Sequence, residues 1–278
     1  MKCPKALRLE NLSLHFLKGS FTMPHFFVSP KGIKGNEVLI IGGEARHIAT
    51  VLRKKKGDEI DIFDGSGNEF RVRILGIDRF GGFPRIRAGI IARKRMEREA
   101  KLKITLFQSI PKGNRLDFII QKSTEIGISQ VVPIITERTI ARLDSKKRKE
   151  RTLRWQKIAQ EAAKQSGRNS VPKVGPVLDF SQALSQFSEI RSQAGIIAWE
   201  MEEENHLREV LKGIVRGGIS NLALSVFVGP EGGFTPEEVE RARRAGVVPV
   251  SLGSRILRTE TAGLVVAIVA LYESSDLG

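Results

Sequence analysis

The hydrophobic pattern of this 278-residue chain changes once, at a charged stretch over residues 93–99. Before that stretch, short β-like runs are separated by glycine-rich turns, and after it apolar strands alternate with helices of amphipathic pattern. No single regular architecture accommodates both patterns. The chain is therefore predicted to form two domains, a small β-barrel followed by an α/β domain with a parallel sheet.

The first pattern covers residues 23–95 and is typical of a small barrel. A helix is expected around Glu44–Arg53, where apolar side chains recur at helical spacing. The stretch 93–99 is expected to be a linker, and residues 1–22 an N-terminal extension without an assigned role. Glycine-rich turns separate four runs of strand character: Glu37–Ile41, Glu59–Phe63, Glu69–Leu75 and Arg85–Ile91.

The second pattern covers residues 100–278 and is typical of strands joined by crossover helices. The expected strands are Ile104–Gln108, Val131–Ile135, Gly195–Trp199, Leu224–Val228 and Val247–Leu252. The expected helices are Arg115–Ile126, Asp144–Ser166, a segment that begins after Thr235, and Thr261–Tyr272. The clearest helix boundary signals are a capping box at Thr235 and Glu238, Pro236 at the first helical position, and terminal glycines at Gly127, Gly167 and Gly246.

The chain carries a formal net charge of +15, and this charge is unevenly distributed. Residues 1–175 are strongly basic, whereas residues 176–278 carry a small net negative charge. Such a division favours a surface that binds a polyanion, joined to a part with a different task. A solvated basic surface without a partner is the alternative.

Several classes of protein are excluded. Cys3 is the only cysteine, so neither a disulfide framework nor a cysteine-based zinc site can form. The four histidines lack the spacing of metal ligands, and we expect no metal. The longest apolar stretch is far shorter than the roughly 20 residues of a membrane span, and residues 1–22 lack the apolar core of a secretion signal. We expect a cytoplasmic protein with no membrane partner.

Three segments that follow expected strands are candidates for ligand binding, because ligands of open α/β sheets bind where the strands end. They are Trp199–Glu200, the glycine-rich loop Gly229–Phe234, and Leu252–Ala262, which holds two arginines and a glutamate. Each also has an ordinary structural interpretation: a core tryptophan before a solvated helix start, a tight turn, and a surface loop capped by Thr259 or Thr261. The basic run at Arg53–Lys56 is typical of a segment that binds phosphate without reading sequence, and a solvated surface is the alternative.

Two motifs, Gly229-Pro-Glu-Gly-Gly-Phe-Thr-Pro-Glu-Glu and Leu252-Gly-x-Arg-Ile-Leu-Arg-x-Glu-Thr-Ala, resemble those of the bacterial 16S ribosomal RNA uracil-3 methyltransferases. These enzymes are a branch of the SPOUT superfamily, which uses S-adenosylmethionine. The likeness extends over about residues 23–275. It includes Met23-x-x-Phe26-Phe27-Val28, the His47 to Arg53 segment, Lys122-x-x-Glu125-Ile-Gly127 and Glu161-Ala-Ala-x-Gln165-Ser166-Gly-Arg168.

The resemblance implies an RNA-binding barrel of PUA type, and an α/β domain whose C-terminal segment is threaded into a deep trefoil knot. It also implies a homodimer that acts on the 16S rRNA of the small ribosomal subunit. S-adenosylmethionine would be held by residues of the three candidate loops: Trp199, Glu200, Gly229, Pro230, Glu231, Gly232, Gly233, Leu252, Gly253, Ile256, Leu257, Arg258, Thr261 and Ala262.

For catalysis, the resemblance points to Arg258, which would stabilise negative charge on the uracil oxygens, and to Glu260, which would accept a proton or orient that arginine. Chemistry is expected to depend on Arg258 more than on any other ionisable side chain. The candidates for RNA contacts are Arg53, Lys54, Lys55, Lys112, Lys122 and Arg168. Two alternatives stay open: a SPOUT methylase for another rRNA or tRNA site, and a non-catalytic RNA-binding assembly factor.

Overall fold

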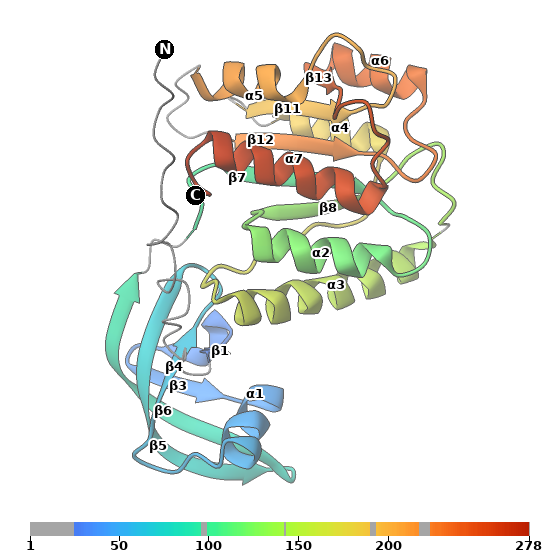
Figure 1. Cartoon of the computed structure of the whole chain (residues 1–278). Coiled ribbons are helices and arrows are strands. Elements are labelled where there is room, and N and C mark those ends of the chain that lie inside the picture. Colours follow the sequence, from blue (N-terminus) through green and yellow to red (C-terminus); the bar gives the residue numbers. More distant parts are fainter. Residues whose placement is uncertain (1–24, 96–98, 142, 190–192, 217–222, 278) are drawn as a thin grey trace, which may run out of the picture.

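A computed structural model describes residues 25–95, 99–141, 143–189, 193–216 and 223–277 of the chain. The predicted N-terminal extension therefore lies outside the described residues. Two separate sheets organise the rest, a six-stranded sheet in the first 95 residues and a seven-stranded sheet after residue 100 (Figure 1). The change of hydrophobic pattern along the sequence coincides with the passage from one sheet to the other.

The first sheet has the strand order β1-β4-β5-β6-β3-β2, and only β1 and β4 pair in parallel. Its strands are β1 (His25–Phe27), β2 (Ile33–Lys34), β3 (Glu37–Ile40), β4 (Glu59–Phe63), β5 (Asn68–Phe80) and β6 (Phe83–Arg95). The predicted helix is present as α1 (Gly42–Arg46), continued by a wider π-helical turn over His47–Val51. Buried side chains such as Ile48 and Ile62 fill the space between this helix and the strands.

The predicted linker over residues 93–99 is wrong in its first half, because β6 continues to Arg95. Arg93 and Lys94 pair with Phe70 and Glu69 of β5. The Arg93 guanidinium lies 5.8 Å from the centre of the Phe70 ring and donates to the carbonyl oxygen of Gly35. Both charged side chains are exposed although they lie on a strand, and a run of charges along the sequence does not distinguish such a strand from a loop.

The second sheet is entirely parallel, with the order β10-β8-β7-β12-β11-β13, and β9 pairs with β8. The strands are β7 (Lys103–Ser109), β8 (Gln130–Ile135), β9 (Lys173–Val174), β10 (Leu178–Asp179), β11 (Gln193–Ala198), β12 (Ala223–Val228) and β13 (Val247–Val250). The helices are α2 (Arg115–Ile126), α3 (Ser145–Ser166), α4 (Phe180–Glu189), α5 (Leu207–Arg216), α6 (Pro236–Arg244) and α7 (Thr259–Glu273). The five predicted strands are confirmed, whereas β9, β10, α4 and α5 were not predicted.

Helices cover both faces of this sheet, and two buried clusters separate the layers. Helices α2, α3, α5 and α7 pack on one face, and α4 and α6 on the other. Within β12, Val226 contributes to the first cluster and Phe227 to the second, as the alternation of side chains along a strand requires. The Phe227 ring stacks on that of Phe107 in β7 at 4.4 Å between centroids.

In the α/β part, the predicted helix boundaries agree with the structure to within one residue except at the last helix. Gly127 and Gly167 end α2 and α3 with φ values of 116° and 69°, in the left-handed region that glycine favours. Thr235 and Glu238 form the complete capping box at the start of α6. Helix α7, however, begins at Thr259 rather than Thr261, with Arg258 as its N-cap.

The last helix does not stay beside the strand that precedes it. Strand β13 lies at one edge of the sheet, next to β11, whereas α7 contacts α2, β7 and β12 near the middle. The chain between β13 and α7 therefore runs back past neighbouring strands. This path is compatible with the predicted trefoil knot, whose threading stays a prediction. None of the described helices is both long and apolar enough to cross a membrane.

Candidate functional site

The segments after β11, β12 and β13 meet around one cavity of about 760 Å³. Because parallel strands end at the same edge of the sheet, the three predicted loops become neighbours although they are distant in sequence. Every predicted cofactor contact lines this cavity except Thr261, whose side chain is exposed on α7. The cavity is also lined by residues outside that set of predicted cofactor contacts: Arg115, Glu202, Glu203, His206, Ser251, Ser254, Arg255 and Thr259.

At two glycines of the loop after β12, a side chain would be crowded by its surroundings. Gly233 has a φ of +68°, and a Cβ there would collide with the carboxylate of Glu200. A Cβ on Gly229 would come within 3.1 Å of the Gly233 carbonyl carbon. The carbonyl oxygen of Gly232 accepts a hydrogen bond of 2.6 Å from Arg138. The loop thus has a fixed shape with its backbone exposed to the cavity.

A buried hydrogen-bonded pair joins this loop to the start of α7. The Thr259 hydroxyl donates to the carbonyl oxygen of Gly229 at 2.6 Å, and the Gln108 amide donates to the same hydroxyl at 2.9 Å. The interpretation of Thr259 as a helix cap is therefore wrong, since its side chain bonds to another loop. No sequence pattern indicates this role for Gln108, which lies near the end of β7.

Glu231 attaches the same loop to α2. Its Oε1 accepts hydrogen bonds from the Arg115 guanidinium at 2.8 Å and from the backbone N–H of Lys112 at 3.0 Å. The side chain of Lys112, a predicted RNA contact, is exposed beside this junction. The loop is consequently held from three sides, by Arg138, Thr259 and the start of α2.

Two polar side-chain atoms at the cavity are buried without a hydrogen-bond partner among the described residues: Trp199 Nε1 and Glu260 Oε2. A buried polar group without a partner is costly, so these atoms indicate positions where a bound ligand would supply an acceptor and a donor. The lining also carries five glutamates and three arginines. Its excess of negative charge suits a ligand with a cationic group.

Glu202 is buried, which corrects the interpretation of residues 202–204 as a solvated helix start. Its Oε1 accepts hydrogen bonds from the backbone N–H groups of Glu204 and Asn205, and its Oε2 accepts from Arg243 at 2.9 Å. The carboxylate thus shapes the turn before α5. The acidic run along the sequence does not reveal this, because its partner Arg243 belongs to α6.

Arg258 and Glu260 lie on the same rim of the cavity, at the first turn of α7. Arg258 is exposed and Glu260 is half-buried. The helix N-terminus beside them places backbone N–H groups and a partial positive charge at this rim. A negatively charged group is therefore stabilised here by the helix as well as by the arginine.

The predicted RNA contacts divide into exposed and buried groups. Arg53 and Lys55 are exposed at the end of the helical segment of the first sheet. Lys122 is half-buried and forms an ion pair of 2.8 Å with Glu125. Arg53 and Lys55, with the half-buried Lys54 between them, form a continuous basic segment.

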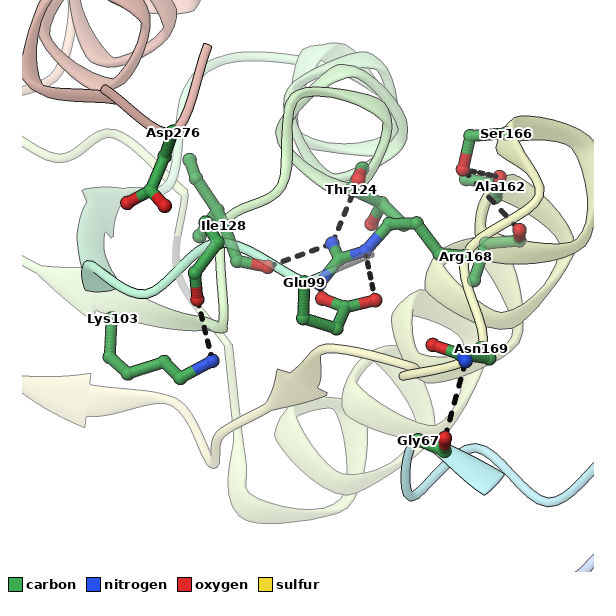
Figure 2. Close-up of polar contacts among 12 residues, drawn as sticks. Gly67, Glu99, Lys103, Thr124, Ile128, Ala162, Ser166, Arg168, Asn169 and Asp276 are labelled. Carbon is green, nitrogen blue, oxygen red and sulfur yellow. Dashed lines mark hydrogen bonds and ion pairs between the residues drawn. The ribbon is translucent and has the colours of Figure 1, made fainter. Parts of the chain in front are cut away.

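Arg168 does not lie on the surface, so the predicted phosphate contact is not available to it. Its Nη1 donates to the carbonyl oxygens of Thr124 and Ile128, and its Nε and Nη2 donate to the Glu99 carboxylate (Figure 2). The next residue, Asn169, exchanges hydrogen bonds with Gly67 of the first sheet. Arg168 is a structural residue at the junction of the two parts.

No group of three or more histidine, cysteine, aspartate or glutamate side chains arranged for a metal ion occurs in the described part of the chain. A cysteine-based zinc site is excluded on separate grounds, because the sequence contains a single cysteine.

Comparison with known proteins identifies the family. A family model described as an RNA methyltransferase domain matches residues 98–271, and one described as an RNA methyltransferase PUA domain matches residues 40–79. The chain belongs to the RNA methyltransferase family. It is 34% identical to the ribosomal RNA small subunit methyltransferase E of Bacillus subtilis, over 86% of this chain and 91% of that protein.

Two other members of the family show the same extent of similarity. The protein of the same name from Synechocystis is 32% identical over 92% of this chain and 80% of its own length. A crystal structure of the Neisseria gonorrhoeae ribosomal RNA small subunit methyltransferase E, bound to S-adenosyl methionine, has a TM-score of 0.74. It is 35% identical to this RNA methyltransferase and covers 90% of this chain and 97% of its own.

Proposed function

We propose that this RNA methyltransferase transfers a methyl group from S-adenosylmethionine to ring nitrogen 3 of a uridine in the 16S rRNA of the small ribosomal subunit. The observation that carries this proposal is the convergence of the three predicted loops around one cavity. The names of the small-subunit relatives and the cofactor in the Neisseria structure support the substrate and the methyl donor.

The residues of the cavity fit this cofactor. The volume of about 760 Å³ lies within the range of roughly 300–1,000 Å³ for small-molecule sites. Trp199 Nε1 and Glu260 Oε2 are buried and unpaired, so a ligand with both donors and acceptors satisfies them. The negative lining suits a sulfonium cation, and Gly229 and Gly233 leave the loop backbone open to contact. The bound cofactor supplies an electrophilic methyl group.

The residues at the rim match what attack by ring nitrogen 3 requires. This nitrogen carries a proton at neutral pH, and removing that proton places negative charge on the neighbouring carbonyl oxygens. Arg258 and the N-terminus of α7 stabilise that charge, and Glu260 accepts the proton or holds Arg258 in place. Because nitrogen 3 lies on the pairing edge of the base, the uridine must be unpaired or flipped out of a helix.

The first sheet and the junction supply the surface for the RNA. Phosphates of the RNA are proposed to contact the basic segment Arg53–Lys55, whose first and last side chains are exposed, and the side chain of Lys112 beside the cavity. Lys122 is proposed to contribute only where the RNA displaces its pairing with Glu125.

We also propose that two chains associate through α7. Ile268 and Tyr272 are exposed on this helix, four residues apart on one side, and Ile256 before it is 89% exposed. An apolar stripe of this kind is costly in water and favours an interface. The mass of the particle measured by light scattering during gel filtration tests this proposal, and a monomer at micromolar concentration refutes it.

Transfer of a tritiated methyl group tests the function directly. Small subunits, 70S ribosomes and naked 16S RNA serve as substrates, and nucleoside mass spectrometry identifies the product. The expected product is 3-methyluridine, and any other methylated nucleoside refutes the proposed position. Arg258→Ala is expected to abolish turnover while calorimetry still detects cofactor binding, and wild-type turnover by this variant refutes the role of Arg258.

A further inference from the structure

The β5–β6 hairpin projects beyond the rest of the first sheet. Strand β4 pairs with β5 only over residues 69–73, and β3 pairs with β6 only over residues 86–89. Among the described strands, none other than β5 and β6 themselves therefore pairs with the segment from Gly76 to Arg85. Its turn lies at the opposite end of β6 from the passage to β7 (Figure 1).

The turn places two phenylalanines side by side. Gly81 and Gly82 have φ values of 58° and 83°, as a two-residue type I′ turn requires. Phe80 and Phe83 pair directly across the two strands, so both rings point to the same side of the hairpin. They are 76% and 67% exposed, whereas Phe26, Phe63 and Phe70 of the same sheet are buried.

Cationic side chains follow the two rings along the same side. Because side chains alternate along a strand, Arg85 and Arg87 point to the side of Phe83. Arg87 forms an exposed ion pair of 3.2 Å with Asp78, and Arg85 Nε is buried without a hydrogen-bond partner. The tip thus combines exposed aromatic rings with an arginine that has unused hydrogen-bonding capacity.

We propose that this hairpin tip is an RNA-binding site, in which Phe80 and Phe83 stack on one or two unpaired nucleobases and Arg85 contacts the adjoining phosphate. Stacking on aromatic rings and contact by arginine is the chemistry by which proteins bind single-stranded RNA. The two rings bury at most roughly 500 Å², below the roughly 800 Å² per partner of a stable protein interface. A nucleobase is a closer match in size than a second protein.

This inference rests on the proposed function for the identity of the RNA, and adds a contact separate in sequence from the basic segment Arg53–Lys55, which follows the helical turn His47–Val51. It predicts that part of the affinity for 16S RNA is independent of salt. The ring contacts release no counterions, whereas the phosphate contacts do.

Substitutions at the two rings test the proposal, and exposure makes them harmless to folding. The Phe80→Leu/Phe83→Leu variant keeps apolar side chains but removes the rings, and Phe80→Tyr/Phe83→Tyr keeps both rings. The dissociation constant for naked 16S RNA and for a uridine decamer is measured at several salt concentrations. The leucine variant is expected to bind about 5- to 150-fold more weakly with an unchanged salt slope, and the tyrosine variant like the wild type.

Methyl transfer by the same proteins separates the two proposals. If the leucine variant has the RNA affinity and KM of the wild type, the stacking site is overturned. Methyl transfer by the wild-type protein supports the proposed function in either case. If the wild-type protein transfers no methyl group but its RNA binding depends on the two rings, the proposed function is overturned and the stacking site is supported. Sedimentation with phosphatidylglycerol vesicles is the further control. Ring-dependent vesicle binding with unchanged RNA affinity overturns the proposal in favour of a lipid surface.

Discussion

Replacing Arg168 by alanine is expected to destabilise the α/β part of the chain substantially. The Arg168 side chain is 9% exposed, and its donors reach two backbone carbonyl oxygens and the Glu99 carboxylate. Truncation leaves the carbonyl oxygens of Thr124 and Ile128 without this donor and Glu99 without its cation. Breaking a buried ion pair by removing one partner costs about 3–5 kcal/mol.

The lower end of that range is the expectation for this site. The Glu99 side chain is 19% exposed, so water partly solvates the carboxylate after the arginine is gone. We expect Arg168→Ala to lower the free energy of unfolding by about 3 kcal/mol. Urea unfolding followed by tryptophan fluorescence measures this, because both tryptophans, Trp155 and Trp199, lie in the α/β part. The m-value should stay constant.

Two further variants make the result specific. In a double-mutant cycle, Glu99→Gln and Arg168→Ala should show a coupling energy of about 1–3 kcal/mol. The matched control is Arg244→Ala, whose exposed pair with Glu240 is four residues away on α6 and is worth less than about 1 kcal/mol. A loss below about 1 kcal/mol for Arg168→Ala, similar to the control, refutes the structural role and restores the phosphate contact as the better explanation.

Three other outcomes are expected. Trp199→Phe should weaken binding of S-adenosylmethionine about 2- to 12-fold by calorimetry, because it removes one hydrogen-bond donor, and unchanged affinity contradicts this. Gly233→Ala should cost about 1–3 kcal/mol of stability through its positive φ and contact with Glu200, and a neutral result by thermal unfolding contradicts the loop geometry. Burial acts to raise the pKa of Asp276, but hydrogen bonds from the backbone N–H groups of Leu102 and Lys101 outweigh it, so the pKa is lowered. Stability gained from this carboxylate is present above about pH 4 and is lost as the pH falls through the lowered pKa. Asp276→Asn should therefore have a lower free energy of unfolding than the wild type at pH 7, and this difference should disappear in acid. Urea unfolding at each pH measures this.

The parts of the fold that the sequence predicted are those decided by neighbours along the chain. The capping box at Thr235 and the glycines after α2 and α3 act within one helical turn, so their residue types alone determine the boundary. The parallel strands β7, β8 and β12 are buried on both faces, and their continuous apolar runs distinguish them from loops. Strands β9 and β10 have two residues each, too few for any periodicity to develop.

The candidate site divides in the same way. The position of the three loops at one site was predictable, because each follows a buried strand and the carboxyl ends of parallel strands lie at the same edge of the sheet. Gln108 was not predictable, since its partner Thr259 lies 151 residues further along the chain. The role of Arg168 was missed for the same reason, because Glu99 is 69 residues away. A polar residue type indicates that a partner exists, and only the fold decides whether that partner is RNA, water or another segment of the chain. The basic residues 1–175 therefore indicate an RNA-binding part, in agreement with the match to a PUA domain, and yet one of their arginines, Arg168, is buried and stabilises the fold.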